Sequence, residues 1–223
     1  MLVIGGGNAG LNAAIAAARA GRRVVLLESA PAALRGGNSR HTRDIRYAHD
    51  GHDRYVTGSY AEAEFWSDLQ RVTGNATTEE LAWLTIRQSA DIAEWGLANG
   101  VRWQLPLRGT LHLARTNIFM LGGGKAMINA YYAAAEKLGV EVCYESEARE
   151  LVVRDGEFVA AVVERDGRRH ELPAKAVVAA AGGFEANLPW LKSYWGDAAD
   201  NFIVRGTPYN QGRVLAALLD AGA

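Results

Sequence analysis

The first 28 residues contain the feature that most constrains the fold of this 223-residue chain. An apolar run, Met1–Ile4, opens into the glycine-rich segment Gly5–Gly10, and an alanine-rich stretch follows to Ala20. A second apolar run, Val24–Leu27, ends in Glu28. This order predicts a strand, a glycine turn, a helix and a second strand, which together form a parallel βαβ unit.

Three glycines of the turn have the G-x-G-x-x-G spacing, and each is expected to do a separate job. Gly5 permits the tight turn, Gly7 lets the backbone approach a diphosphate, and Gly10 lets the helix pack close to the strand. Free N–H groups and the positive end of the helix dipole then face the anion. Glu28 lies 18 residues after Gly10, where a carboxylate can accept hydrogen bonds from ribose hydroxyls. The segment predicts a dinucleotide site; the alternative is a βαβ turn that binds nothing.

Composition excludes several other classes of protein. The formal net charge is −1, which provides no electrostatic field for nucleic acid or for a membrane surface. The single cysteine, Cys143, cannot form a disulfide within the chain and favours a reducing compartment, so a cytoplasmic location is expected. The five histidines show no metal-ligand spacing with an acid or with this cysteine, so no metal site is predicted.

The rest of the chain adds helices and an antiparallel meander to the βαβ unit. Hydrophobic periodicity and stop signals predict helices over 62–72, 78–98, 125–138 and 211–220. The second helix starts with a capping-box pattern, Thr77 with Glu80, and Leu81 and Leu84 are expected in its core-facing stripe. Short strands are predicted over 101–104 and 110–114.

Two Asp-Gly turns separate three more predicted strands, 148–154, 157–165 and 168–172. A fully apolar strand, 176–180, follows them. The order predicts an α/β fold of the Rossmann-like, dinucleotide-binding kind. It has a central parallel sheet, a helix on one face, an antiparallel β-meander on the other, and a helical insertion at about 59–100.

Two further glycine pairs indicate a long cofactor. Gly36-Gly37-Asn38-Ser39 comes eight residues after Glu28, and small residues there let the backbone run against a flat ring system. Ala181-Gly182-Gly183 ends a buried strand, where ligands of open α/β sheets gather. Together with the first motif, these pairs predict an extended cofactor that touches several loops.

These motifs resemble those of the flavoprotein subunits of the fumarate reductase and succinate dehydrogenase family. The resemblance covers essentially the whole chain and rests on Gly5–Gly10, Glu28, Gly36–Ser39, Ala180–Phe184 and Gly212–Gly222. The run Arg35–Arg43 is the more specific signal, and it is similar to the tricarballylate dehydrogenase subgroup of that family. A cobalamin-pathway flavoprotein shares much of the same sequence.

The resemblance implies a Rossmann-like FAD-binding domain with FAD held non-covalently. Carried over position by position, it assigns the diphosphate to Gly5, Gly7, Asn8, Ala9 and Gly10. It assigns the adenosine ribose to Glu28 and adenine to the backbone of Ala148. The other implied cofactor contacts are Ser29, Gly36, Gly37, Asn38, Ser39, Arg40, Ala181 and Gly182.

The resemblance also implies the reaction. Two hydrogens leave adjacent carbons of a small polycarboxylate, as from tricarballylate to cis-aconitate, and a hydride passes to flavin N5. Because arginine forks grip carboxylates, Arg43, Arg46 and Arg115 are candidate substrate ligands. The alternative is a solvated basic loop, or arginines that pair with Asp44, Asp50 and Asp53.

The family's domain order implies that residues 1–223 are the first segment of the FAD-binding domain. In the family, a capping domain with the arginine proton donor and a later FAD-binding segment follow the part that matches Gly212–Gly222. Both are expected to be absent here, and the catalytic residues are expected beyond Ala223. The resemblance further implies a membrane-linked iron–sulfur partner that reoxidises the flavin at the inner face of the membrane.

Three functional hypotheses are therefore open. The first is a flavin-dependent dehydrogenase of a small polycarboxylate, with fumarate reductase or succinate dehydrogenase chemistry as its near neighbour. The second is a nicotinamide-dependent oxidoreductase, and the third is a non-catalytic dinucleotide-binding fragment. A flavin absorbance spectrum separates the first from the second.

Overall fold

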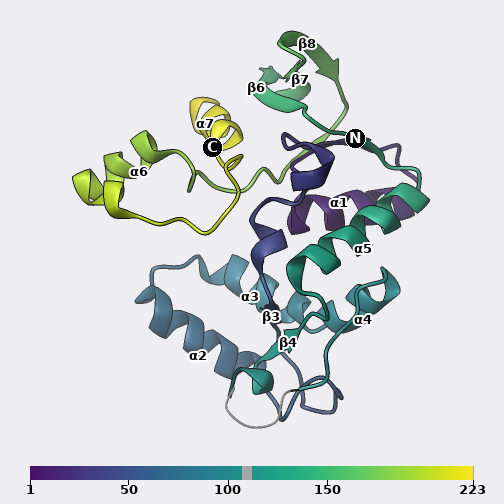
Figure 1. The fold of residues 1–223 in the computed structure, drawn as a ribbon, viewed down its shortest axis with the longest axis vertical. Coiled ribbons are helices and arrows are strands. Elements are labelled where there is room, and N and C mark those ends of the chain that lie inside the picture. The colour runs from purple at the N-terminus through teal and green to yellow at the C-terminus, as the bar shows by residue number, and fades with distance from the viewer. Residues whose placement is uncertain (107–111, 223) are drawn as a thin grey trace. The chain divides into compact units, whose positions relative to one another are not determined.

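The computed structural model describes residues 1–106 and 112–222, which fall into two compact units (Figure 1). The first unit contains Met1–His41 together with the chain from Tyr131 onward. The second unit contains Thr42–Ala130. No helix among the described residues has both the length and the apolar composition needed to cross a membrane.

A four-stranded parallel sheet forms the centre of the first unit. Its strand order is β5-β2-β1-β9, formed by Glu141–Cys143, Val25–Leu27, Leu2–Ile4 and Val177–Ala179. The strand order reverses at β1, because β2 pairs with one of its edges and β9 with the other. Ligands of open α/β sheets bind at such a reversal, beyond the carboxyl ends of the strands. The central parallel sheet predicted from the sequence is confirmed.

Alternation along β1 determines what covers each face of this sheet. Leu2 and Ile4 pack in one apolar cluster with residues of the meander. Val3 points to the opposite face, because a Cβ added to Gly10 in helix α1 (Asn8–Arg19) would lie 3.4 Å from Val3 Cγ1. The sheet is thus covered by a helix on one side and by β-structure on the other, as predicted.

The meander is a separate three-stranded antiparallel sheet, β6-β7-β8, formed by Glu147–Arg154, Glu157–Arg165 and Arg168–Pro173. Asp155 and Asp166 both have positive φ, and a glycine with positive φ follows each of them. These are the two predicted Asp-Gly turns. Helix α7 (Arg213–Asp220) contacts β6 (Figure 1), and its Val214 belongs to the same apolar cluster as β1 and the meander.

Two elements between β9 and α7 were not predicted. Helix α6 (Leu188–Trp195) is followed by the 3₁₀ helix η4 (Gly196–Asn201). Asn187 caps α6, because its side-chain oxygen accepts a hydrogen bond from the N–H of Trp190 at 3.1 Å. A helix of two turns is too short for its periodicity to stand out among so many aromatic residues.

The second unit is mainly helical. Its helices are α2 (Glu62–Thr73), α3 (Glu79–Ser89) and α4 (Ile92–Ala98), and α5 (Gly123–Lys137) begins in it and ends in the first unit. A two-stranded antiparallel ribbon pairs β3 (Asp44–Arg46) with β4 (Asn117–Phe119). Three further short 3₁₀ helices are described: η1 (Ala32–Leu34) and η2 (Gly37–His41) in the first unit, and η3 (His112–Arg115) in the second.

Several predictions for the second unit were wrong. The helix predicted over 78–98 is two helices, because the chain turns at Ala90 and Asp91. The helix begins after Thr78, whose side chain makes no capping hydrogen bond, so the capping box is not formed. Leu81 and Leu84 are exposed, and the buried stripe of α3 contains Ala82 and Ile86 instead.

The two short strands predicted near residue 100 were also wrong. Residues 101–104 contribute only an isolated bridge, between Trp103 and Met120. Of the strand predicted over 110–114, residues 112–114 belong to η3, and residues 110 and 111 lie outside the described residues. The helices predicted over 62–72, 125–138 and 211–220 occur with small shifts at their ends.

Candidate nucleotide-binding site

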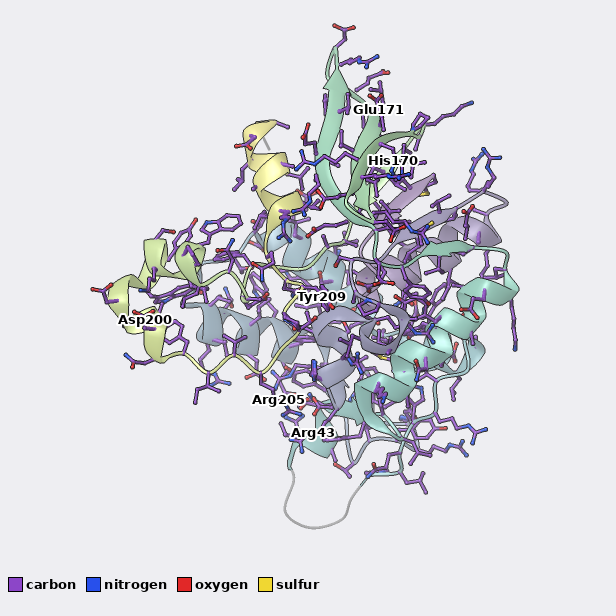
Figure 2. All side chains as sticks on the ribbon, turned by 45° about the horizontal axis from the view of Figure 1, so that its top comes forward. Arg43, His170, Glu171, Asp200, Arg205 and Tyr209 are labelled. Atoms are coloured by element: carbon purple, nitrogen blue, oxygen red, sulfur yellow. The ribbon has the colours of Figure 1, made fainter. Side chains whose placement is uncertain are left out.

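A pocket opens at the carboxyl ends of the parallel strands of the first unit. Its walls come from segments that are far apart in the sequence: 4–9 after β1, 27–29 after β2, 37–39, 146–148 at the start of β6, 180–182 after β9, and 209–215. Tyr209, labelled in Figure 2, belongs to the last of these segments. Loops that leave neighbouring parallel strands meet at one edge of the sheet, which brings these segments together.

Gly5 and Gly10 are required by the packing of the protein itself. Gly5 has a φ of +106°, and a Cβ there would lie 2.2 Å from the carbonyl oxygen of Ala180. A Cβ on Gly10 would lie 1.8 Å from the carbonyl oxygen of Gly5. Both separations are far below van der Waals contact, so only glycine fits. The predicted structural roles of the two residues, in the tight turn and in helix–strand packing, are confirmed.

Gly7 differs from them because packing does not require it. Its φ of −78° is open to any residue. The atoms nearest to an added Cβ would be Ser39 Oγ at 3.6 Å and the carbonyl oxygen of Gly36 at 3.7 Å, which are ordinary contacts. Gly7 also lines the pocket. The missing side chain therefore leaves room for a ligand to reach the backbone.

The start of α1 offers hydrogen-bond donors to this space. The N–H of Asn8 donates to Ser39 Oγ at 3.1 Å, which joins the first glycine segment to the second. No group in the described part of the chain accepts from the N–H groups of Gly7 and Ala9. The first turn of α1 also carries no acidic side chain. Free amides at the positive end of a helix dipole suit an anion.

Glu28 is buried at the end of β2 and is held by three donors. Its Oε1 accepts from the N–H of Ala30 at 2.9 Å. Its Oε2 accepts from the N–H of Gly36 at 3.2 Å and from the hydroxyl of Tyr132 at 3.3 Å. Burial and the charge of Glu28 raise the pKa of Tyr132, so its hydroxyl stays protonated and remains a donor. Because each carboxylate oxygen can accept two hydrogen bonds, Glu28 keeps capacity for a ligand hydroxyl.

Asparagine side chains hold the wall formed by 209–215. Asn38 Oδ1 accepts from the N–H of Thr207 at 2.8 Å. Asn210 is buried, and its Nδ2 donates to Glu185 Oε2 at 3.1 Å. Gly182 has a φ of +76°, and a Cβ there would lie 2.9 Å from Asn210 Nδ2, so glycine leaves room for this asparagine in the loop after β9. These contacts attach the segment before α7 to the loops after β2 and β9.

Most of the predicted cofactor contacts meet in this pocket: Gly5, Gly7, Asn8, Ala9, Glu28, Ser29, Gly37, Asn38, Ser39, Ala148, Ala181 and Gly182. Three others do not line it. Gly10 packs beneath the turn, Gly36 donates to Glu28, and Arg40 donates to the carbonyl oxygens of Ala33 and Arg35.

Several lining residues were missed by the sequence analysis: Ser146, Glu147, Tyr209, Asn210, Gln211, Gly212, Arg213, Val214 and Leu215. Gly212 to Leu215 lie in the segment Gly212–Gly222 that carries the family resemblance, which assigned no cofactor contact to them. The others belong to the pocket only through tertiary contacts.

The three predicted substrate arginines lie in the second unit. Arg115 forms a two-pronged ion pair with Glu64, and Arg46 Nη1 lies 3.5 Å from Asp68 Oδ2. The side chain of Arg43, labelled in Figure 2, is exposed and makes no ion pair or hydrogen bond with any described residue. Pairing with acids was the predicted alternative; the partners of Arg46 and Arg115 differ from the expected Asp44, Asp50 and Asp53.

Metal-ligating side chains are not assembled within the described ranges 1–106 and 112–222. No group of three or more His, Cys, Asp or Glu residues there is close enough to hold a metal ion. His170 lies on β8 of the meander beside Glu171 (Figure 2). Cys143 is a free thiol in β5, and burial raises its pKa, which disfavours the reactive thiolate.

Comparison with known proteins gives the family. The whole chain, residues 1–223, matches the family described as FAD binding domain. The chain is 30% identical over 203 residues to a probable fumarate reductase of Shewanella frigidimarina and 29% identical over 202 residues to a urocanate reductase of Eggerthella lenta. Each alignment covers 87% of this chain but only 34% and 33% of the two relatives. The chain thus spans about a third of their length.

A solved structure agrees over the whole chain. The open conformation of a flavocytochrome c3 fumarate reductase matches with a TM-score of 0.86 and 26% identity. The match covers 100% of this chain and 40% of that protein.

Proposed function

This chain belongs to the FAD-binding domain family, among the flavoproteins related to fumarate reductase and succinate dehydrogenase, and FAD is its cofactor; we propose that the pocket described above is the FAD site of an oxidoreductase. The observation that supports this site most is Gly7. It is a glycine that packing does not require, it lies beside unpaired amides, and it lines the pocket.

The residues of the pocket fit FAD. The amides at the start of α1 would bind the diphosphate, with Gly7 giving it access to the backbone. Glu28 would accept from the adenosine ribose, and the backbone of Ala148 would contact adenine. Segments 37–39 and 181–182 would extend the site toward the flavin. When bound, the flavin supplies hydride transfer, and the protein supplies orientation and electrostatics.

We propose that the substrate is a small carboxylate with a carbon–carbon double bond, or its saturated counterpart. The relatives named above act on fumarate and on urocanate, and in both molecules the double bond is conjugated to a carboxylate. Oxidation of tricarballylate to cis-aconitate creates the same arrangement. The run Arg35–Arg43 favours tricarballylate, whereas the relatives named above favour fumarate or urocanate.

For the whole protein we propose that residues 1–223 are the first segment of the FAD-binding domain, with 59–100 as a helical insertion. Segments that match the remaining two thirds of the relatives would supply the proton donor and most of the substrate site. Arg43 stays a candidate substrate ligand, because Arg46 and Arg115 already have acid partners. A membrane-linked iron–sulfur protein is the proposed electron-transfer partner.

Replacing Gly7 by alanine is expected to weaken FAD binding without loss of the fold. The new methyl group fits the protein but occupies the space proposed for the diphosphate, where crowding costs about 1–3 kcal/mol. This corresponds to roughly fivefold to 150-fold weaker binding. Titration with FAD, followed by flavin fluorescence, measures the affinity, and urea unfolding checks the fold. Equal affinity in Gly7→Ala and the wild type would argue against this placement of the diphosphate.

Reoxidation of a reduced flavin tests the proposed reaction. The full-length gene product that carries this chain is loaded with FAD, photoreduced without oxygen, and mixed separately with cis-aconitate, fumarate and urocanate. We expect one of these acids to restore the absorbance of oxidised flavin, and NAD⁺ to leave it unchanged. Reoxidation by NAD⁺ alone supports a nicotinamide-dependent enzyme, and no reoxidation by any of them contradicts the proposed reaction.

A further inference from the structure

Arg213 is the only lysine or arginine on the walls of the pocket, as far as the structure describes the chain. The other charged residues that line the pocket, Glu28 and Glu147, are acidic. FAD carries a negatively charged diphosphate, so a pocket with two acids depends strongly on its one cationic side chain. This imbalance gives weight to Arg213, which is not among the cofactor contacts predicted from the sequence.

An ion pair fixes the position of the Arg213 guanidinium. Arg213 is the first residue of α7, and its Nη1 donates to Oε1 of Glu147, the first residue of β6. Glu147 directly precedes Ala148, the proposed adenine contact. Glu147, Ala148 and Arg213 all line the pocket, so the pair holds a positive charge on its wall. Its two side chains are 40% and 24% exposed, so a ligand can reach the guanidinium.

The negative charge of Glu147 is shared between Arg213 and a second arginine. The other oxygen of Glu147, Oε2, lies 2.9 Å from Nη2 of Arg149. Arg149 also donates two hydrogen bonds to Glu164 of β7, at 3.1 and 3.2 Å. The meander thus holds Glu147 in place from one side, and Arg213 shares a carboxylate that a second arginine already contacts. The guanidinium keeps attraction for an anion in the pocket.

The backbone around Arg213 is equally constrained. Gly212 has a φ of +77°, and a Cβ there would lie 2.2 Å from the ring of Trp190. Val214 is buried in the apolar cluster that contains Leu27 and Ala148. Arg213 therefore stands between two residues whose positions are set by packing, and the start of α7 is a fixed wall of the pocket.

We propose that Arg213, oriented by Glu147, is a cofactor-specificity residue that binds the adenosine diphosphate half of FAD. The inference rests on the proposed FAD site and adds a ligand that neither the glycine motifs nor the family resemblance assigned. Arginine suits this role because its planar fork can hold the carboxylate with one edge and a phosphate oxygen with another.

ADP and FMN separate the two halves of FAD and serve as probes with the full chain. Arg213→Met keeps most of the side-chain length and removes the charge. We expect it to weaken FAD and ADP binding each by about tenfold or more, since hydrogen bonds to charged groups contribute about 1.5–3 kcal/mol. The affinity for FMN, which contains the riboflavin half of FAD, should not change. Arg213→Lys keeps a charge without the fork and should bind ADP with intermediate affinity.

Arg169→Met is the matched control. Arg169 donates to Glu164 in the same network of the meander, but it does not line the pocket. This variant should bind FAD, ADP and FMN as the wild type does. Glu147→Gln should weaken ADP binding less than Arg213→Met, and the double variant should bind no more weakly than Arg213→Met alone, because Glu147 acts through Arg213.

The results distinguish a failure of the role proposed for Arg213 from a failure of the proposed FAD site. Unchanged ADP affinity in Arg213→Met, with its unfolding midpoint in urea preserved, overturns the role of Arg213. Equal weakening of ADP and FMN overturns it too, because the effect is then not at the adenosine end. If Arg213→Met does not fold, Arg213→Lys takes its place, and wild-type ADP affinity in that variant counts against the fork. A wild-type chain that binds neither FAD nor ADP overturns the proposed FAD site itself.

Discussion

Alanine at position 10 is expected to destabilise the first unit strongly and to abolish FAD binding. The added methyl group would lie 1.8 Å from the carbonyl oxygen of Gly5, which is backbone and cannot rotate away. Relief requires that α1 move off β1, and Leu11, Ala14 and Ile15 of α1 would then lose their burial. Overpacking of a rigid site costs about 1–3 kcal/mol, and the loss of buried apolar contacts adds to it. We expect the free energy of unfolding, measured in urea, to fall by at least about 3 kcal/mol.

Gly21→Ala is the control for this prediction. Gly21 follows the same helix and has a φ of +73°, but no atom lies within 4 Å of an added Cβ. Only backbone strain opposes alanine there, so the expected cost is about 1 kcal/mol. If Gly10→Ala lowers the free energy of unfolding no more than Gly21→Ala does, the close packing of α1 on the glycine turn is not a source of stability.

Removal of the Glu28 carboxylate should have the second largest effect. In Glu28→Ala the N–H groups of Ala30 and Gly36 and the hydroxyl of Tyr132 lose their acceptor inside the protein. Each buried donor left unsatisfied costs about 1–3 kcal/mol, so the free energy of unfolding should fall by about 3 kcal/mol or more. FAD binding should be lost beyond detection, because the loop at Gly36 is no longer tied to β2.

Glu28→Gln separates the charge from the hydrogen bonds. The amide oxygen of the glutamine still accepts hydrogen bonds, but its NH₂ group faces other donors. We therefore expect the free energy of unfolding of this variant to lie between those of the wild type and Glu28→Ala. Glu157→Ala removes an exposed acid at the start of β7 and should unfold as the wild type does. A fully stable Glu28→Ala with intact FAD affinity would show that the carboxylate neither supports the loop nor holds the ribose.

The glycine motif thus combines two kinds of requirement. Gly5 and Gly10 are needed by the fold, and their replacement is expected to act on stability. Gly7 is free of packing constraints, and its replacement is expected to act on the cofactor. Measuring unfolding and FAD affinity on the same variants separates the two.

Local patterns predicted the regular parts of the fold. The βαβ unit follows from two apolar runs, a glycine turn and an alanine-rich stretch, and the meander follows from two Asp-Gly turns. These signals work because a strand, a turn or a helix is determined largely by neighbours in the chain. The prediction was wrong where side-chain burial depends on what another element covers, as for Leu81 and Leu84.

The sequence by itself determined the glycine turn, the acid after β2 and the strand ends from which the proposed FAD site is built. Only the tertiary structure decided that 209–215 closes the pocket and that Arg213 meets Glu147, a residue 66 positions earlier. It also decided that Arg46 and Arg115 have acid partners on α2. The physical reason is that an ion pair depends on which surfaces packing brings together, and a charged side chain carries no periodic or turn signal that names its partner.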